Sequence, residues 1–274
     1  MMQPYSVLMT VWRQDDPGQL AQSLDSLVGQ TQPTDDLLVV ADGPIPPELT
    51  AVLDRYRAAW PMIRLVPLPE NVGLGAALNA GLPLCRHELV ARMDADDIAL
   101  PERCALQVAR FEQDDQLAIV GTFAEEFADD PSNVVAVKSV PTSHEAIYRY
   151  GKRRNPFIHP TVMYKKSVIL GLGGYSTLRR GQDIELFTRL LHAGHRAANI
   201  AQPLLKFRSD EQLYLRRKTW KASRNYMQTI YKSWRMGYAG FMDLVIAVGM
   251  RLTLLLMPPA LARLVYRKVL RKSR

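Results

Sequence analysis

The chain has 274 residues, of which 47% are hydrophobic and 23% are charged. This composition supplies a sizeable apolar core and excludes an intrinsically disordered protein. The two cysteines, Cys85 and Cys104, exclude a disulfide framework and a zinc cluster built on cysteine pairs, and we expect both to be buried thiols in a reducing compartment. No basic segment followed by an apolar one opens the chain, so no secretory signal is expected.

Charge is distributed unevenly along the chain. The net charge is +8, from 35 Lys and Arg against 27 Asp and Glu. Residues 206–274 hold sixteen of the basic residues and three of the acids, a net of +13, which leaves residues 1–205 with a net of −5. An acidic body argues against nucleic-acid binding, and the basic end predicts an anionic partner.

The first hundred residues alternate strand and helix patterns. Short apolar, β-prone runs predict strands, and apolar residues at helical spacing predict the helices between them. Strands joined by helices of this length predict βαβ units, and hence an α/β fold with a mostly parallel central sheet. The expected strands are residues 5–12, 36–41, 63–68 and 87–93, and the expected helices lie near residues 20–28, 47–59 and 75–84.

The middle of the chain is less regular. Strands are expected at residues 118–123 and 134–138, and a helix at residues 183–193. Residues 155–160, which hold two prolines, and the glycine-rich residues 171–174 are expected to be loops.

The basic end of the chain has a helical pattern. Residues 210–236 mix basic and aromatic residues, and residues 237–257 are apolar but interrupted by charges too early to span a bilayer, which takes about 20 residues. The apolar residues share one helical face, which predicts an amphipathic element on an anionic membrane surface, followed by the basic residues 263–274. The alternative is a helix that packs on the body or on a second subunit. The face consists of Phe241, Leu244, Val245, Val248, Leu252 and Leu255.

Two aspartates come directly after expected strands. Asp42 follows residues 36–41, and Asp94 follows residues 87–93. Because ligands of such sheets bind beyond the carboxyl ends of the strands, this placement predicts a binding site. The alternative is that these aspartates only form turns and helix caps.

Asp94, Asp96 and Asp97 form the strongest chemical signal in the sequence. Carboxylates at positions i and i+2 just past a strand can converge on one divalent cation, Mn²⁺ or Mg²⁺, that keeps open positions for phosphate oxygens. Such a cation would neutralise charge on a diphosphate leaving group. The alternative is that Asp96 or Asp97 caps a helix that starts near Pro101.

Six short segments, taken together and in their order along the chain, form a pattern that can be compared with known protein families. They are residues 6–12 (SVLMTVW), 39–43 (VVADG), 70–81 (ENVGLGAALNAG), 91–97 (ARMDADD), 155–163 (NPFIHPTVM) and 181–189 (GQDIELFTR). Together they resemble family 2 glycosyltransferases of the GT-A fold, over about residues 5–208. More narrowly, they are similar to bacterial enzymes that build O-antigen, capsule and exopolysaccharide repeat units on polyprenyl-diphosphate lipids.

The resemblance implies a donor site. Asp42 would hydrogen-bond the base, while Asn71 and Gly73 would shape the base and ribose pocket. Arg92 would lie near the sugar nucleotide. Asp96 would ligate the metal, and Asp94 would contact the ribose or sugar and be a second candidate ligand. The full implied set is Thr10, Val11, Asp42, Asn71, Gly73, Arg92, Asp94, Ala95 and Asp96.

The resemblance also implies a catalytic base. Asp183 would take the proton from the acceptor hydroxyl as that oxygen attacks the anomeric carbon opposite the diphosphate, in a single inverting displacement. The family usually has Glu-Asp where this chain has Gln182-Asp183, so the base is kept. Capping of the following helix is the alternative role of Asp183. His159 and Gln182 would lie on the acceptor and diphosphate side, and Glu185 is a minor candidate base.

We therefore expect an inverting, metal-dependent hexosyltransferase. The expected donor is UDP-Gal or UDP-Glc, and the expected acceptor is a sugar on polyprenyl diphosphate at the cytoplasmic face of the bacterial inner membrane, where the protein would be peripheral. The expected domains are a GT-A catalytic domain at residues 1–208 and membrane-associating helices at residues 209–274. No nucleic-acid partner is expected, and a homodimer is left open.

Two other functions remain as alternatives. One is a nucleotidyltransferase or other nucleotide-sugar enzyme, which usually has a glycine-rich basic loop after its first strand that residues 10–18 lack. The other is a non-catalytic membrane scaffold, against which the set Asp42, Asp94, Asp96 and Asp183 argues.

Overall fold

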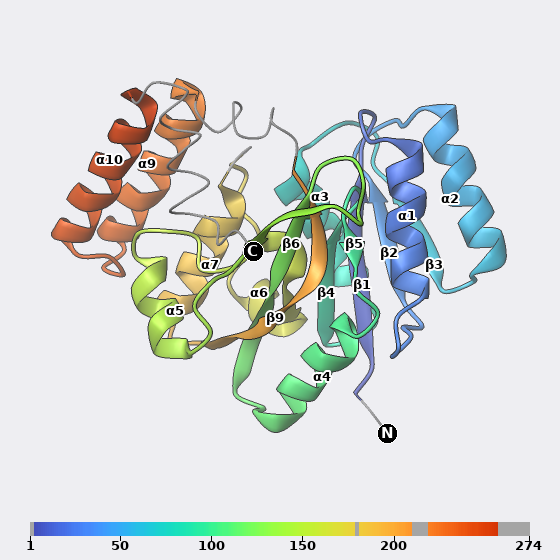
Figure 1. Cartoon of the computed structure of the whole chain (residues 1–274), viewed down its shortest axis with the longest axis horizontal. Helices are drawn as coiled ribbons and strands as arrows, with labels where there is room; N and C mark the ends of the chain where they lie inside the picture. The colour runs from blue at the N-terminus through green and yellow to red at the C-terminus, as the bar shows by residue number, and fades with distance from the viewer. Residues whose placement is uncertain (1–2, 179–180, 210–218, 257–274) are drawn as a thin grey trace.

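A computed structural model of the chain describes residues 3–178, 181–209 and 219–256 (Figure 1). Within these residues nine strands form one sheet in the order β3-β2-β1-β4-β8-β6-β9-β5, with β7 paired to β6. The predicted basic residues 263–274 and the start of the helical pattern at 210–236 lie outside the described residues. The strands are β1 (Tyr5–Val11), β2 (Leu37–Ala41), β3 (Ile63–Pro67), β4 (Leu89–Asp94), β5 (Ile98–Ala99), β6 (Leu117–Phe127), β7 (Val134–Lys138), β8 (Met163–Lys165) and β9 (Arg196–Arg208).

The first half of the sheet is parallel. Strand β1 lies between β2 and β4, and β2 also pairs with β3. These are the four strands that the apolar runs predict, within two residues at each end. Because the strands are parallel, their carboxyl ends meet at one edge, where Thr10 pairs with Val40 on one side and with Asp94 on the other. The predicted site residues that follow β2 and β4 therefore share this edge.

The second half makes the sheet mixed rather than mostly parallel. Strand β8 is antiparallel to β4 and β6, β7 is antiparallel to β6, and β5 is antiparallel to β9, whereas β6 and β9 are parallel. The sequence patterns do not predict β8 or β9. The first has only three residues, and the second contains Pro203 and polar residues in place of an apolar run. Pairing of β9 with β5 brings Arg208 to the turn that follows β4.

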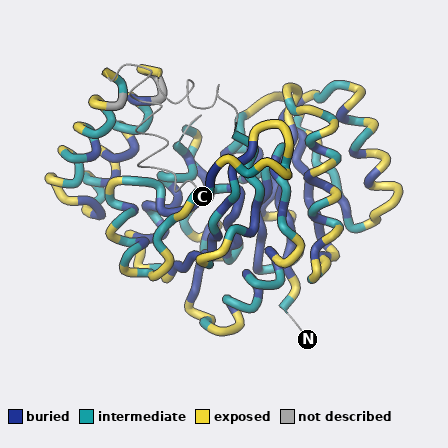
Figure 2. Tube along the Cα trace, in the orientation of Figure 1, coloured by how far each residue is buried: buried dark blue, intermediate teal, exposed yellow. Residues whose placement is uncertain are grey.

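Helices cover both faces of the sheet, and strand side chains alternate between two apolar cores. On β1, Met9 faces the core under α1, α2 and α4, whereas Leu8 faces the core under α3, α6 and α7. On β2, Val39 faces the same core as Met9, and Val40 faces the same core as Leu8. The strands are mostly buried and the outward faces of the helices are exposed (Figure 2). The helices are α1 (Pro17–Val28), α2 (Pro47–Ala59), α3 (Leu74–Gly81), α4 (Arg103–Gln113), α5 (His144–Gly151), α6 (Lys166–Gly171), α7 (Gln182–His192), α9 (Trp220–Arg235) and α10 (Phe241–Leu256), with short 3₁₀ turns at Leu82–Leu84 and His159–Thr161. Both cysteines are free and buried, as predicted.

Helices α9 and α10 form a hairpin beside α5 and α7, at the end of the molecule opposite α2 (Figure 1). Tyr238, in the connection between them, is buried and donates its hydroxyl to the Tyr148 carbonyl at 2.7 Å. Arg153 Nε pairs with Asp243 at 2.6 Å. The hairpin thus packs on the body, the alternative that the sequence left open, while part of its apolar face stays exposed. Among the residues placed in the structure, none of the helices combines the length and the hydropathy needed to cross a membrane.

Candidate active site

Residues 94–97, here called the acid loop, bring three carboxylates together where β4 ends. Carboxylate oxygens of Asp94, Asp96 and Asp97 lie within 4.8 Å of one another. Arg208 holds the loop from β9, because its main-chain N–H donates to Asp97 Oδ1 at 2.9 Å and its Nε donates to the Asp96 carbonyl at 3.0 Å. The loop conformation therefore depends on a residue more than a hundred positions along the chain.

Burial and nearby negative charge raise the pKa of two of these carboxylates. Burial, and then the charge of Asp94, raises the pKa of Asp96 to about 6. Burial and the charges of Asp96 and Asp94 raise the pKa of Asp97 well above its ordinary value. Asp15, in the turn after β1, has a pKa raised to about 7 by burial and by the same two charges, although the Trp12 N–H donates to its carboxylate at 2.9 Å. Asp15 belongs to this negative cluster, and no motif in the sequence pointed to it.

The acid loop fits a divalent cation. Its ligands are hard carboxylate oxygens, the type that Mg²⁺ and Mn²⁺ prefer. Asp97 Oδ2 is buried and has no hydrogen-bond partner within the part of the chain that the structure describes, and neighbouring carboxylates disfavour one another's ionisation. A bound cation would relieve both costs. The alternative role as a helix cap is wrong, because the N-cap of α4 is Glu102 and neither Asp96 nor Asp97 caps it.

Arg92 lies behind the acid loop. Its side chain is buried, and Nη1 donates to Asp94 Oδ2 at 2.6 Å while Nη2 donates to Asp94 Oδ1. The resemblance placed Arg92 near the sugar nucleotide, and the structure directs its guanidinium at a candidate metal ligand. Its charge also lowers the pKa of His159 and opposes the rise in the pKa of Asp183. Arg92 is therefore the electrostatic link between the acid loop and the acceptor side.

A second cluster follows β2. The buried Asp42 carboxylate accepts hydrogen bonds from Asn71 Nδ2 at 2.9 Å and from the main-chain N–H groups of Val72 at 2.7 Å and Gly73 at 3.0 Å. Gly43 permits this close approach, because its φ is +84° and a Cβ there would lie 2.7 Å from Asn71 N. Asp42, Asn71 and Gly73, which the resemblance assigned to one pocket, are thus brought together.

The remaining residues on the donor side differ in whether their side chain or only their main chain is available to a ligand. Thr10 is half-buried on β1, between the ends of β2 and β4. Val11 and Ala95 are buried in the apolar core, so they offer a ligand their main chain rather than their side chains. Trp12, which the sequence patterns did not single out, keeps an exposed indole directly after β1.

Asp183 stands in the first turn of α7. Gly181 is the N-cap of this helix and has a φ of +83°, so Asp183 is not the capping residue. Asn155 Nδ2 donates to Asp183 Oδ2 at 2.7 Å and orients the carboxylate. Burial raises the pKa of Asp183 above its ordinary value, which makes the ionised carboxylate a stronger base.

His159 and Tyr175 form a side-chain pair in which Tyr175 is buried and His159 is half-buried. His159 Nε2 and Tyr175 Oη lie 3.0 Å apart, and Asn79 fixes Tyr175 through main-chain hydrogen bonds of 2.7 and 2.8 Å. Burial lowers the pKa of His159 well below its ordinary value, so the ring is neutral. Burial raises the pKa of Tyr175 to about 12, and the charges of Asp183 and Asp94 both contribute to that rise. Tyr175 therefore lies in the field of both carboxylates.

Two residues beside Asp183 have different surroundings. The amide oxygen of Gln182 is buried and has no hydrogen-bond partner among the described residues. Glu185 pairs with Arg189 at 2.8 Å, and Arg189 also donates to the carbonyls of Leu172 and Gly174. Glu185 thus has a structural partner in Arg189, which bonds to the loop before α7, and its role as a candidate base stays a prediction.

Comparisons with known proteins identify the family of the chain. The profile described as Glycosyl transferase family 2 matches residues 6–173. The chain is 33% identical over 264 residues to the amylovoran biosynthesis glycosyltransferase AmsE of Erwinia amylovora, covering 96% of this chain and 98% of that protein. It is also 33% identical over 268 residues to a UDP-Gal:alpha-D-GlcNAc-diphosphoundecaprenol beta-1,3-galactosyltransferase of Escherichia coli, covering 98% and 97%.

A solved structure shares the fold. The mannosyltransferase PcManGT from Pyrobaculum calidifontis, in complex with GDP-Man and Mn²⁺, superposes with a TM-score of 0.65 at 16% identity, covering 96% of this chain and 79% of that chain. The mixed α/β sheet with helices on both faces is therefore the GT-A fold that the sequence motifs predicted.

Proposed function

The chain belongs to glycosyl transferase family 2, and from this premise we propose that it moves a hexose from a UDP-sugar to a polyprenyl-diphosphate-linked saccharide. The observation that carries the proposal is that the acid loop and Asp183 both lie in the field of the buried Arg92. The named donor and acceptor of the Escherichia coli relative support UDP-Gal and a lipid-linked GlcNAc as first choices, with UDP-Glc as the second donor. Family membership replaces the nucleotidyltransferase and scaffold alternatives.

The donor nucleotide would lie across the carboxyl ends of β1, β2 and β4. Asp42 already orders Asn71 and Gly73, and a carboxylate can accept a further hydrogen bond from a pyrimidine N–H. The exposed Trp12 indole offers a flat apolar face to a base. Thr10 adds a hydroxyl between these two elements.

A divalent cation, Mn²⁺ or Mg²⁺, would be held by Asp94 and Asp96, with Asp97 as a third carboxylate within reach. When bound, the cation would neutralise the charge that develops on the departing diphosphate. The chain's own residues prepare the site, because Arg92 orients Asp94 and Arg208 fixes Asp97.

Asp183 would accept the proton of the attacking acceptor hydroxyl. Asn155 orients its carboxylate, and burial raises its pKa, so that it is a better base than an exposed aspartate. The attack would come from the face opposite the diphosphate, and one displacement would invert the anomeric centre. The neutral His159 and the amide oxygen of Gln182, which has no partner among the residues placed in the structure, would face the acceptor or its diphosphate.

A lipid-linked acceptor places the reaction at a membrane surface. We assign the protein to the cytoplasmic face of the bacterial inner membrane, as a peripheral protein. The net charge of +13 on residues 206–274 supports this location, because the cytoplasmic leaflet is anionic.

Product formation by the purified full chain tests the proposal. UDP-, GDP- and dTDP-sugars are offered with a synthetic GlcNAc-diphosphate-lipid, in Mn²⁺ or in EDTA. We expect release of UDP from a single UDP-hexose, in Mn²⁺ alone. Equal turnover in EDTA would refute the metal site, and turnover of a GDP-sugar alone would refute the donor assignment.

A further inference from the structure

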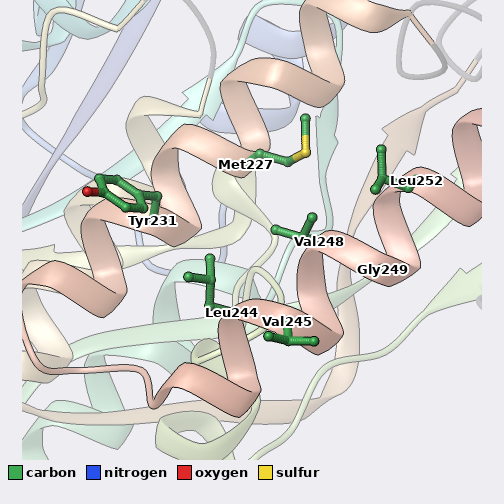
Figure 3. Close-up of a pocket in the computed structure, with 7 residues that line it drawn as sticks. All are labelled: Met227, Tyr231, Leu244, Val245, Val248, Gly249 and Leu252. Carbon is green, nitrogen blue, oxygen red and sulfur yellow. The ribbon is translucent and has the colours of Figure 1, made fainter.

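The hairpin of α9 and α10 carries an apolar groove on its outer surface (Figure 3). The groove has a volume of about 570 Å³ and lies between Met227 and Tyr231 of α9 and one stripe of α10. The stripe is the same helical face that the sequence pattern predicted. We call the groove together with Phe241 the hairpin face: Met227, Tyr231, Phe241, Leu244, Val245, Val248, Gly249 and Leu252.

Much of the hairpin face is in contact with solvent. Phe241 is 62% exposed, Tyr231 50% and Val245 46%, in contrast to the fully buried apolar residues of the sheet. Contiguous exposed apolar side chains mark interaction surfaces on soluble domains. The hairpin face is therefore a surface with an unassigned partner.

The hairpin is firmly attached to the catalytic body. Asp243 of α10 pairs with Arg153, and the buried Tyr238 bonds to the Tyr148 carbonyl. Helix α9 packs on α7, and a Cβ on Gly181 would lie 3.3 Å from Thr229 Oγ1. Since Gly181 is the N-cap of the helix that carries the proposed base, the hairpin face has a fixed position relative to the acceptor side.

Cationic residues accompany the apolar face. Arg224, Lys232 and Arg235 of α9 are exposed. Residues 219–256 hold five Lys and Arg against one acid, and residues 257–274, which continue directly from α10, hold six Lys and Arg and no acid. An apolar stripe with basic neighbours complements an anionic bilayer, where the apolar side chains enter the headgroup boundary and the cations meet the phosphates.

We propose that the hairpin face is the membrane-docking surface and that it lies in the headgroup layer of an anionic bilayer. Because α9 packs on α7, docking on this face would keep the N-terminal end of α7 close to the bilayer that carries the acceptor, a consequence that rests on the proposed function. A second copy of the chain on this face would cover its apolar stripe but would face the same basic residues, so like charges would oppose that contact.

Vesicle co-sedimentation of the full chain tests the proposal. Phosphatidylcholine vesicles are compared with vesicles that contain phosphatidylglycerol in addition, for the wild type and for the triple variant F241S/V245S/L252S. The control variant is Trp60→Ser, because Trp60 is an aromatic residue that is 40% exposed and lies at the opposite end of the molecule, after α2. We expect the wild type and the control to bind the anionic vesicles, and the triple variant to bind at least about tenfold more weakly.

A second pair of measurements separates this proposal from the enzymatic one. A charge-reversal variant, K232E/R235E, is expected to weaken binding to anionic vesicles at low salt and to make the remaining binding less sensitive to salt than that of the wild type, because fewer cations contribute. On a short-chain, water-soluble acceptor, both variants are expected to retain wild-type turnover. Unchanged vesicle binding by the triple variant, or a wild-type dimer that this variant abolishes, would overturn the docking surface. Vesicle binding by a wild type that transfers no sugar to the soluble acceptor would instead refute the proposed function alone.

Discussion

Arg92 holds Asp94 through two parallel hydrogen bonds, one of them 2.6 Å long. Both side chains point to the same side of β4, because they are two residues apart on a strand. The arginine side chain is 1% exposed and the aspartate side chain 30% exposed. Since a buried cation needs a partner, the stability of the fold is coupled to a carboxylate of the proposed metal site.

Asp94→Asn and Asp96→Asn are expected to change stability in opposite directions in the metal-free chain. The first leaves the buried guanidinium of Arg92 without its counter-charge and is expected to lower the free energy of unfolding by about 1–3 kcal/mol, because the aspartate side chain of the pair is partly exposed. The second removes one of three crowded carboxylates and is expected to raise stability. Urea unfolding in EDTA at pH 7.5 measures both. An Asp94→Asn chain as stable as Asp96→Asn would show that the Arg92 pair contributes nothing.

The acid loop makes stability depend on pH and on metal. In the folded chain the pKa of Asp96 is about 6, above its ordinary value of 3.8. Because the folded state binds this proton more tightly, the resulting stability is present below pH 3.8 and is lost as the pH rises to about 6. A cation needs the ionised carboxylate, so Mn²⁺ is expected to raise the Tm clearly at pH 7.5 and little at pH 5. Thermal unfolding with Mn²⁺ or EDTA at both pH values decides this, and shifts of equal size would count against the metal site.

Arg208 is expected to act on metal binding through the acid loop. Arg208→Ala removes the Nε bond to the Asp96 carbonyl and the contact of its guanidinium with the Phe127 ring, 4.6 Å away. We expect about tenfold weaker Mn²⁺ binding, the equivalent of one lost hydrogen bond. Electron paramagnetic resonance of free Mn²⁺ measures the affinity, with the exposed Arg57→Ala as control. Wild-type affinity in Arg208→Ala would place the residue outside the metal site.

The variant Glu185→Gln tests which of the two carboxylates of α7, Asp183 or Glu185, acts as the base. Breaking the partly buried pair with Arg189 is expected to cost about 1 kcal/mol of stability. The transfer rate of the folded variant is expected to stay within about threefold of the wild type, because Glu185 has a structural partner. A fall of about a hundredfold in kcat, the size of a lost general base, would move the base role to Glu185.

The parallel half of the sheet could be predicted because buried strands give continuous apolar runs. The same logic located Asp42 and Asp94, since both follow such runs directly. The sequence did not predict β8 because three residues are too few to show a periodic pattern. It did not predict β9 because this segment is held as a strand by pairing with β6 rather than by an apolar composition of its own.

Several of the residues that support the site could not be predicted from the sequence, because tertiary contacts bring them there. Asp15, in the turn after β1, is affected by the charges of the acid loop, and Arg208 contacts the loop from β9. Neither relationship follows from a local sequence pattern. Tyr175 lies in a glycine-rich loop, and its role follows only from its contact with His159. Asn155 and Asn79 lay within segments that carried the family resemblance, so a closer inspection of polar residues there could have found them.

The proposed reaction requires the metal-bound donor and a base on α7 to meet in one site. Two variants test it most directly when UDP binding by calorimetry and sugar transfer are measured on the same preparations in Mn²⁺. We expect Asp183→Asn to bind UDP as the wild type does and to lose about 10²–10⁴-fold in kcat, whereas Asp96→Ala loses both binding and transfer. Full turnover in Asp183→Asn, or metal-dependent UDP binding that survives in Asp96→Ala, would contradict the account.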